Sequence, residues 1–320
     1  MTEWMPWLLS GLGLVILLLA GDSLVKGAVN LSLRLGVPAL IVSLTIVAFG
    51  TSAPELLIAI EAILDDAPGL ALGNVVGSNT ANILLVLGIP ALLATMHTSE
   101  CDTRKSYSYM IAGSILFIAL AFRGVFDWIS GLVLLAALAY VLFDQAMEAK
   151  GHRAACAAGT ADEEEIEGVD PDLPGWRIAV FLILGLIGLP LGANLLVENA
   201  TVLAKTYGVS DTVIGLTLVA VGTSLPELAT TVMAALRRQA DVALGNVIGS
   251  NMFNLLAIIG IASLVGPISV DPAFLTFDLW VMLAASILLV PFVYMRRDIT
   301  RVWGVILSAL YVTYLIIVLT

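Results

Sequence analysis

Two glutamates, Glu55 and Glu227, each lie in the middle of a long apolar run. The first run reads IVAFGTSAPELLIAI and the second reads LVAVGTSLPELATTV, and neither contains a lysine or an arginine. A carboxylate in an apolar segment is costly unless a cation balances it, so such residues are functional by default. One Ca²⁺ would neutralise two glutamates, and hard oxygen ligands suit Ca²⁺ and Na⁺. These residues therefore predict a site for a hard cation.

Glycine and proline beside each glutamate predict a break in the helix that carries it. Pro54 lacks an N–H group, and its ring crowds the carbonyl of Gly50. We expect the helix to break near residues 49–53 and to leave the carbonyls of residues 48–51 without helical partners. Such carbonyls carry partial negative charge and must face protein or a wet cavity. The second copy repeats the pattern with Gly222, Thr223, Ser224, Pro226 and Glu227.

The next apolar run in each copy carries polar residues at helical spacing. Asn74, Ser78 and Asn82 fall at i, i+4 and i+8 in GNVVGSNTAN, so they share one helix face. GNVIGSNMFN repeats this stripe, and its glycines four apart also favour close helix packing. The residues expected to bind or approach the cation are Ser78, Asn82, Ser250 and Asn254. Cation binding and helix bridging are both open for Asn74, Asn79, Asn246 and Asn251.

Other polar residues of the apolar runs have simpler interpretations. Asp22 can pair with Lys26 at i+4, and Glu61 lies toward the outer end of its run, so both stay outside the predicted site. His97 and His152 lie in loops, and two cysteines are too few for a thiolate metal motif. A transition-metal site is therefore not expected.

The composition predicts an all-α polytopic membrane protein. Of the 320 residues, 60% are hydrophobic and 12% are charged, and the mean hydropathy is +1.03. Soluble domains average nearer half apolar and a quarter charged. A spanning helix needs about 20 apolar residues. Ten transmembrane helices are expected at about 4–25, 37–63, 69–94, 106–123, 125–143, 177–199, 209–235, 241–266, 274–295 and 301–320.

An internal repeat organises these spans. Residues 36–88 align without a gap on residues 208–260, with 25 identities in 53 positions. Five spans separate the second span from the seventh, so the second copy runs through the membrane in the opposite direction. Inverted repeats with interrupted spans are typical of secondary transporters, which bind substrate where the copies meet. We expect two inverted five-helix repeats, residues 1–143 and 177–320, with broken second and seventh helices.

The positive charges predict the orientation. With the N-terminus outside, twelve lysines and arginines fall in inner loops, and only Arg123 and Lys205 fall in outer ones. Both termini should face outward from an inner or plasma membrane, and the linker 144–176 should be cytoplasmic. This linker is acidic and lacks periodicity, so a flexible segment is expected rather than a regulatory Ca²⁺ patch.

The paired motifs GTS-x-PE and GN-x-x-GSN resemble those of the calcium/cation antiporter superfamily, and of its bacterial sodium/calcium exchangers in particular. The resemblance covers both repeats and implies exchange of Ca²⁺ for Na⁺ by alternating access, the first and sixth spans sliding across the bundle. It implies Glu55 and Glu227 as the central Ca²⁺ ligands and carbonyls of Ala48 and Ala220 beside flanking Na⁺ sites. The further ligands that it implies are Thr51, Ser52, Thr223, Ser224, Ser78, Asn82, Ser250 and Asn254.

One departure from the superfamily concerns Asn254, where potassium-coupled members carry Asp. Its amide argues against potassium coupling. Proton-coupled relatives typically carry G-N-x-x-E in place of GTS-x-PE, so this sequence favours Na⁺. A Ca²⁺/H⁺ antiporter with the same carboxylates stays an alternative, because an apolar site raises the pKa of a glutamate.

Rivals of other classes fit less well. A cation channel is usually built from subunits around a shared pore, and an intramembrane enzyme would need motifs such as HExxH or GxSxG, which are absent. No enzyme activity, cofactor, nucleic acid or obligate protein partner is expected. The expected partners are Ca²⁺ and Na⁺, with H⁺ as the alternative counter-ion, and the lipid bilayer.

Overall fold

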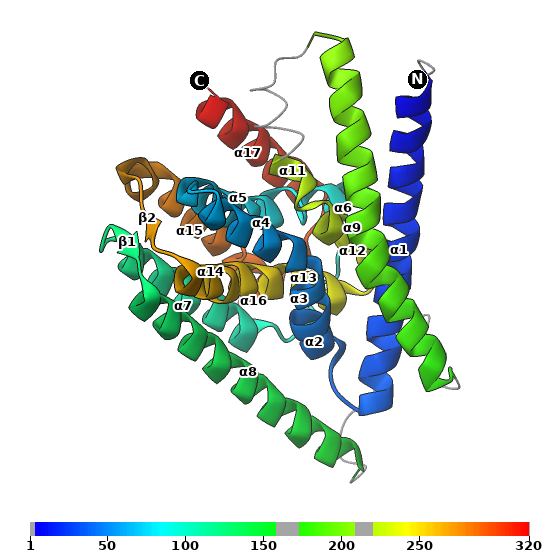
Figure 1. The fold of residues 1–320 in the computed structure, drawn as a ribbon. Coiled ribbons are helices and arrows are strands. Elements are labelled where there is room, and N and C mark those ends of the chain that lie inside the picture. The colour runs from blue at the N-terminus through cyan, green and yellow to red at the C-terminus, as the bar shows by residue number, and fades with distance from the viewer. Residues whose placement is uncertain (1–3, 158–172, 209–219, 320) are drawn as a thin grey trace.

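The computed structural model describes residues 4–157, 173–208 and 220–319, and helices dominate these segments (Figure 1). Short breaks and π-helical turns divide several of them. In the first half the elements are α1 (Met5–Leu35), α2 (Ala39–Val42), η1 (Ser43–Val47, π-helical), α3 (Ala48–Thr51), α4 (Ala53–Leu64), α5 (Pro68–Leu84), α6 (Gly88–Leu93), α7 (Arg104–Ala121), β1 (Val125–Phe126) and α8 (Trp128–Ala157). In the second half they are α9 (Gly175–Thr206), α11 (Ala220–Gly222), α12 (Leu225–Leu236), α13 (Ala240–Met252), η3 (Phe253–Ile258, π-helical), α14 (Ile259–Val265), β2 (Ile268–Ser269), η4 (Phe274–Asp278, π-helical), α15 (Leu279–Ile287), α16 (Val290–Val293) and α17 (Arg301–Leu319).

Seven helices in the described segments are long and apolar enough to cross a membrane, and an eighth span is formed by the bent pair α2–α3 and α4. They coincide with eight of the ten expected spans. Helix α7 forms where the fourth span is expected, but its polar first turns, which begin Arg104-Lys105-Ser106, lower its hydropathy below that of the others. The seventh expected span begins at residues 209–219, outside the described residues, and continues as α11 and α12.

Several helices extend beyond the spans expected from hydropathy. Helix α1 continues to Leu35, ten residues past the expected end, and stops where Gly36 adopts a left-handed conformation with φ 63°. Helix α8 continues to Ala157, so residues 144–157 are helical and the expectation of a flexible linker is wrong for this part. The acidic stretch that follows lies outside the described residues up to position 172.

The two motif-bearing helical segments of each copy lie at the centre of the molecule. Residues Pro68–Leu93 and Ala240–Val265 are 78% and 89% buried over their most apolar windows, whereas α1 and α9 are only 33% and 22% buried. Figure 1 shows α1 and α9 side by side at one edge of the bundle, with α8 along another. Lipid therefore faces the long outer helices, and the polar stripes are shielded from it.

Close approach between α1 and α9 depends on glycine. A Cβ atom on Gly13 would lie 2.7 Å from Leu196 N, and one on Gly185 would lie 2.5 Å from Leu24 Cβ. Helices in lipid associate through small residues of this kind because packing and not water exclusion holds them together. The α1–α9 pair is therefore a closely packed unit.

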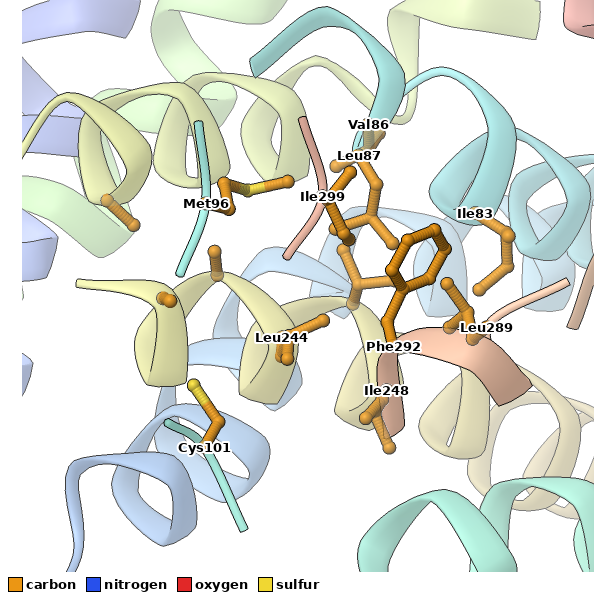
Figure 2. Close-up of a cluster of buried hydrophobic side chains, with 14 of the residues drawn as sticks. Ile83, Val86, Leu87, Met96, Cys101, Leu244, Ile248, Leu289, Phe292 and Ile299 are labelled. Atoms are coloured by element: carbon orange, nitrogen blue, oxygen red, sulfur yellow. The ribbon is translucent and has the colours of Figure 1, made fainter. Parts of the chain in front are cut away.

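A hydrophobic cluster joins the two halves (Figure 2). Val86 and Leu87 from the first half belong to it together with Leu244, Leu289 and Phe292 from the second, and all are almost fully buried. Short loop pairs tie the halves at both ends. Met96 and Ile299 form an antiparallel bridge, and β1 pairs antiparallel with β2.

Candidate functional site

The first half-site, which we define as residues 48–55, is a broken helix as expected. Ser52 leaves the helical conformation with φ −87° and ψ 2°, and the helix axis bends by 41° between the two parts. Pro54 stands in the first turn of α4, where the missing N–H is tolerated. Ala48 differs from the expectation, since its carbonyl accepts hydrogen bonds from Ser52 N at 3.0 Å and Thr51 Oγ1 at 3.2 Å. Proline deprives only the carbonyl four residues before it, and Ala48 lies outside that reach.

The second half-site, residues 220–227, has nearly the same backbone. Ser224 adopts φ −88° and ψ 5°, and α12 begins at Leu225 with Pro226 in its first turn. Ser224 N donates to Val221 O at 3.0 Å. Both glutamates therefore lie in the first turn of a helix, where the positive end of the helix dipole favours a negative charge.

The two carboxylates are buried and close enough to interact. Glu55 and Glu227 are each 1% exposed, and they interact electrostatically with one another. Ser52 Oγ, from the first half-site, donates to Glu227 Oε1 at 3.4 Å. Oε2 of each glutamate is buried without a hydrogen-bond partner. A buried, unpaired acceptor costs about 1–3 kcal/mol, so both oxygens are suited to a cation.

Hydroxyl and amide groups from the neighbouring helices surround each half-site. Thr51 Oγ1 donates to Asn246 Oδ1 at 3.4 Å, and Thr223 Oγ1 donates to Asn74 Oδ1 at the same distance. These two contacts exchange on a shift of 172 residues. Two further hydroxyl pairs, each 3.4 Å or less between oxygens, are Thr51 with Ser250 and Ser78 with Ser224.

Four asparagines link the central helices α5 and α13. Asn79 Nδ2 donates to Asn251 O at 3.2 Å, and Asn251 Nδ2 donates to Asn79 O at 3.3 Å. Asn82 Nδ2 donates to Asn251 Oδ1, and Asn254 Nδ2 donates to Asn79 Oδ1, each at 3.0 Å. Oδ1 of Asn82 and of Asn254 is buried and has no hydrogen-bond partner. The helix-bridging role that the sequence left open thus applies to Asn79 and Asn251.

Eleven of the twelve expected site residues are linked in this way or carry one of the unpaired oxygens. They are Ala48, Thr51, Ser52, Glu55, Ser78, Asn82, Thr223, Ser224, Glu227, Ser250 and Asn254. For Ala220 the structure gives only its place in α11.

Two polar contacts near the site were missed by sequence reasoning. Asn246 Nδ2 donates to Thr231 Oγ1 at 3.2 Å, and Thr231 lies one turn after Glu227, a spacing that could have marked it. Asp22 pairs with Lys26 at 3.0 Å as expected, but also with Arg237 from the end of α12. Nothing in the sequence near Asp22 indicates that partner. Glu61 is exposed, in keeping with its exclusion from the site.

A multi-pass helical membrane protein with buried carboxylates and unpaired oxygens at its centre belongs to the class of cation transporters. Residues 5–146 and 177–320 match the family described as "Sodium/calcium exchanger protein". The chain belongs to this family, which exchanges ions across membranes and is not a family of enzymes. It is an integral multi-pass membrane protein that carries out cation exchange.

Individual relatives agree with this assignment. The chain is 37% identical to the sodium/calcium exchanger MaX1 of Methanosarcina acetivorans, with 96% of each chain covered. It is also 37% identical to the putative antiporter CaxA of Alkalimonas amylolytica, covering 94% of this chain and 95% of CaxA. The solved structure of the sodium-calcium exchanger NCX_Mj superposes with a TM-score of 0.81 at 31% identity, covering 98% of both chains.

Proposed function

We propose that this protein exchanges Ca²⁺ for Na⁺ by alternating access, with Glu55 and Glu227 at the centre of the cation site. One observation carries the proposal. Four buried oxygens lack hydrogen-bond partners, and they are Oε2 of Glu55 and Glu227 and Oδ1 of Asn82 and Asn254. All four are acceptors, two come from each copy, and a hard cation is the partner that would satisfy them together.

The other proposed ligands extend this set. Hydroxyls or carbonyls of Thr51, Ser52 and their counterparts would complete the coordination beside the carboxylates. Ala48 and Ala220 would offer carbonyls to flanking Na⁺ sites. At Ala48 this requires the Thr51 hydroxyl, which now donates to that carbonyl, to turn away. The complete proposed set is Glu55, Glu227, Thr51, Thr223, Ser52, Ser224, Ser78, Asn82, Ser250, Asn254, Ala48 and Ala220.

Reciprocal contacts support the proposed inverted repeats, residues 1–143 and 177–320 with 144–176 between them, and their ten spans. The Asn79–Asn251 hydrogen bonds run in both directions with similar lengths, as a twofold axis between the copies requires. The loop ties agree: β2 begins 172 residues after Met96, and β1 lies 172 residues before 297–298, next to Ile299.

The loop ties also support the proposed orientation, with both termini outside and the linker cytoplasmic. Met96 and Ile299 both lie in loops that the positive charges assign to the inside. Val125 and Ser269, which pair through β1 and β2, both lie in loops assigned to the outside. A wrong orientation of either copy would bring loops from opposite sides together.

Exchange follows from charge. Two ionised glutamates inside a bilayer cannot change sides without cations, because bare charge at that depth is too costly. Either Ca²⁺ or Na⁺ must neutralise them before α1 and α9 move across the bundle. The loaded forms then cross and the empty form does not, which couples the two ion fluxes.

Flux of ⁴⁵Ca²⁺ into proteoliposomes, with Na⁺, K⁺ and pH gradients imposed separately, tests the proposal. Uptake should follow an outward Na⁺ gradient. Uptake driven by the pH gradient alone would favour the Ca²⁺/H⁺ antiporter, and flux without any counter-ion would favour a channel. Glu55→Gln should abolish uptake, whereas Glu61→Gln, an exposed glutamate on the same helix, should leave it unchanged. Normal exchange by Glu55→Gln would overturn the assigned site.

A further inference from the structure

We propose that Asn79 and Asn251 are positioning residues that hold the amides of Asn82 and Asn254 with their carbonyl oxygens turned toward the cation. The inference rests on the proposed function, since it concerns the same site. It adds two residues that do not bind the cation themselves and act through the two asparagines that do.

Two main-chain carbonyls anchor the arrangement. The side-chain NH₂ group of Asn79 donates to the main-chain oxygen of Asn251, and that of Asn251 donates to the main-chain oxygen of Asn79. A carbonyl oxygen can only accept a hydrogen bond. Each NH₂ group must therefore face the backbone of the opposite helix, and the orientation of both amides follows from the chemistry of their acceptors.

The anchored pair then determines how the next two amides are turned. With its NH₂ group committed, Asn79 presents Oδ1 to Asn254, and Asn251 presents Oδ1 to Asn82. Only a donor can meet these oxygens, and Nδ2 of Asn254 and of Asn82 does so at 3.0 Å. If either amide were turned over, two carbonyl oxygens would be held against each other in a buried place, which is unfavourable.

The oxygens left over are the ones that the proposed site requires. Oδ1 of Asn82 and of Asn254 has no hydrogen-bond partner, although both residues are 1% exposed. An amide that turned freely would offer its NH₂ group, which repels a cation, for part of the time. The Asn79–Asn251 pair removes that alternative and keeps two neutral oxygens available, one from each copy.

Asn79→Ala tests this role by removing the acceptor that holds Asn254. The KM for Ca²⁺ in Na⁺-loaded proteoliposomes should rise about tenfold, with Vmax within about twofold of wild type, which corresponds to about 1.4 kcal/mol. In an Asn254→Asp background the same substitution should change the KM less than about twofold, because a carboxylate presents an oxygen in either orientation. A residue that only packs would weaken both backgrounds alike.

Matched variants keep the test decisive. Asn251→Ala acts through Asn82 and repeats the experiment in the other copy, which also serves if Asn79→Ala yields no folded protein. Thr80→Val is the control, because the buried Thr80 hydroxyl donates to Val76 O within its own helix, and its KM should match wild type. An unchanged KM in Asn79→Ala and Asn251→Ala, or equal shifts in the Asn254→Asp background, would overturn the inference.

Failure of the proposed function would be recognised separately. Wild-type protein without Na⁺-driven Ca²⁺ uptake would contradict the exchange proposal and leave the positioning role open to a direct binding test. Equilibrium binding of ⁴⁵Ca²⁺ to the purified proteins should then show the same tenfold weakening for Asn79→Ala and less than about twofold weakening in the Asn254→Asp background. Equal weakening in both backgrounds would contradict the positioning role there too.

Discussion

Ser52 and Ser224 occupy equivalent places in the two half-sites, and their φ and ψ angles differ by no more than 3°. Their side chains nevertheless bond differently. Ser52 Oγ donates to the carboxylate of the opposite copy at Glu227, whereas Ser224 Oγ pairs with the hydroxyl of Ser78. The motif therefore sets the backbone of both half-sites, and side-chain hydrogen bonds distinguish them. A transporter captured facing one side of the membrane cannot be symmetric, and in this protein the asymmetry lies in small movements of hydroxyl groups.

The ends of the helices differ more strongly than the half-sites. Asp22 on α1 bonds Lys26 and Arg237, which ties α1 to the end of α12. The positions 172 residues away from these three hold Asn194, Glu198 and Asp65, which include no cation. The same ion-pair tie therefore cannot form in the other copy, so one end of the bundle carries a connection that its counterpart lacks.

Neutralising either glutamate has the largest expected effect and tests whether the two half-sites are equivalent in charge. Glu55→Gln and Glu227→Gln should each lower Na⁺-driven Ca²⁺ uptake at least about a hundredfold, because each removes one of the two charges that balance Ca²⁺. The measurement is initial ⁴⁵Ca²⁺ uptake in proteoliposomes. A hundredfold loss for one variant beside near-normal uptake for the other would show that a single half-site carries the cation.

Removing the two serine hydroxyls should separate the half-sites. Ser52→Ala removes a donor to a carboxylate, and such bonds contribute about 1.5–3 kcal/mol, so its KM for Ca²⁺ should change about tenfold. Ser224→Ala breaks a contact between two neutral hydroxyls and should change the KM about two- to threefold. Equal shifts in the two KM values would indicate that the observed asymmetry has no energetic weight.

Sequence reasoning predicted best what depends on local chemistry. The break at Ser52 follows from the missing N–H of Pro54, and the convergence of Glu55 with Glu227 follows from the repeat. The seven apolar helices and the bent pair were also predicted, since lipid requires long apolar runs. The ligand roles of the converging residues stay a prediction.

Contacts between distant segments and helix ends were beyond the sequence. Arg237 reaches Asp22 from 215 residues away, and no periodicity reports such a pairing. Hydropathy measures the apolar thickness of lipid and not the length of a helix, so α1 and α8 extended past their expected ends. The carbonyl of Ala48 was misjudged because the effect of Pro54 was assigned to a whole turn instead of to one carbonyl.

Breaking the ion-pair tie should have a moderate effect on stability. Asp22→Ala leaves two partly buried cations without their carboxylate and should lower stability by about 1–3 kcal/mol, seen as a fall in Tm of roughly 2–10 °C. Asn194→Ala, at the equivalent place on α9, should shift Tm by less than about 2 °C. Thermal unfolding of the purified proteins in detergent measures both values. Similar shifts in the two variants would contradict the stated difference between the ends.

The smallest expected effect concerns the two loop ties. Partial burial opposes ionisation of Asp298, but hydrogen bonds from Ser99 and the His97 ring outweigh it and hold the pKa of Asp298 below its usual range. A lowered pKa means that Asp298 stabilises the tie fully above the ordinary Asp value near 4, and that this contribution disappears as the pH falls through the folded-state pKa.

Asp298→Asn should therefore lower Tm by about 1–3 °C at pH 7 and have a smaller effect near pH 3. Asp102→Asn, an exposed residue in the loop that Asp298 contacts, is the control and should show no such pH dependence. Hydrogen exchange of the β1–β2 tie, which is held by main-chain hydrogen bonds, should not change between wild type and Asp298→Asn. Equal loosening of both ties would mean that the ends of the bundle open together, and the difference between them would then have no consequence for stability.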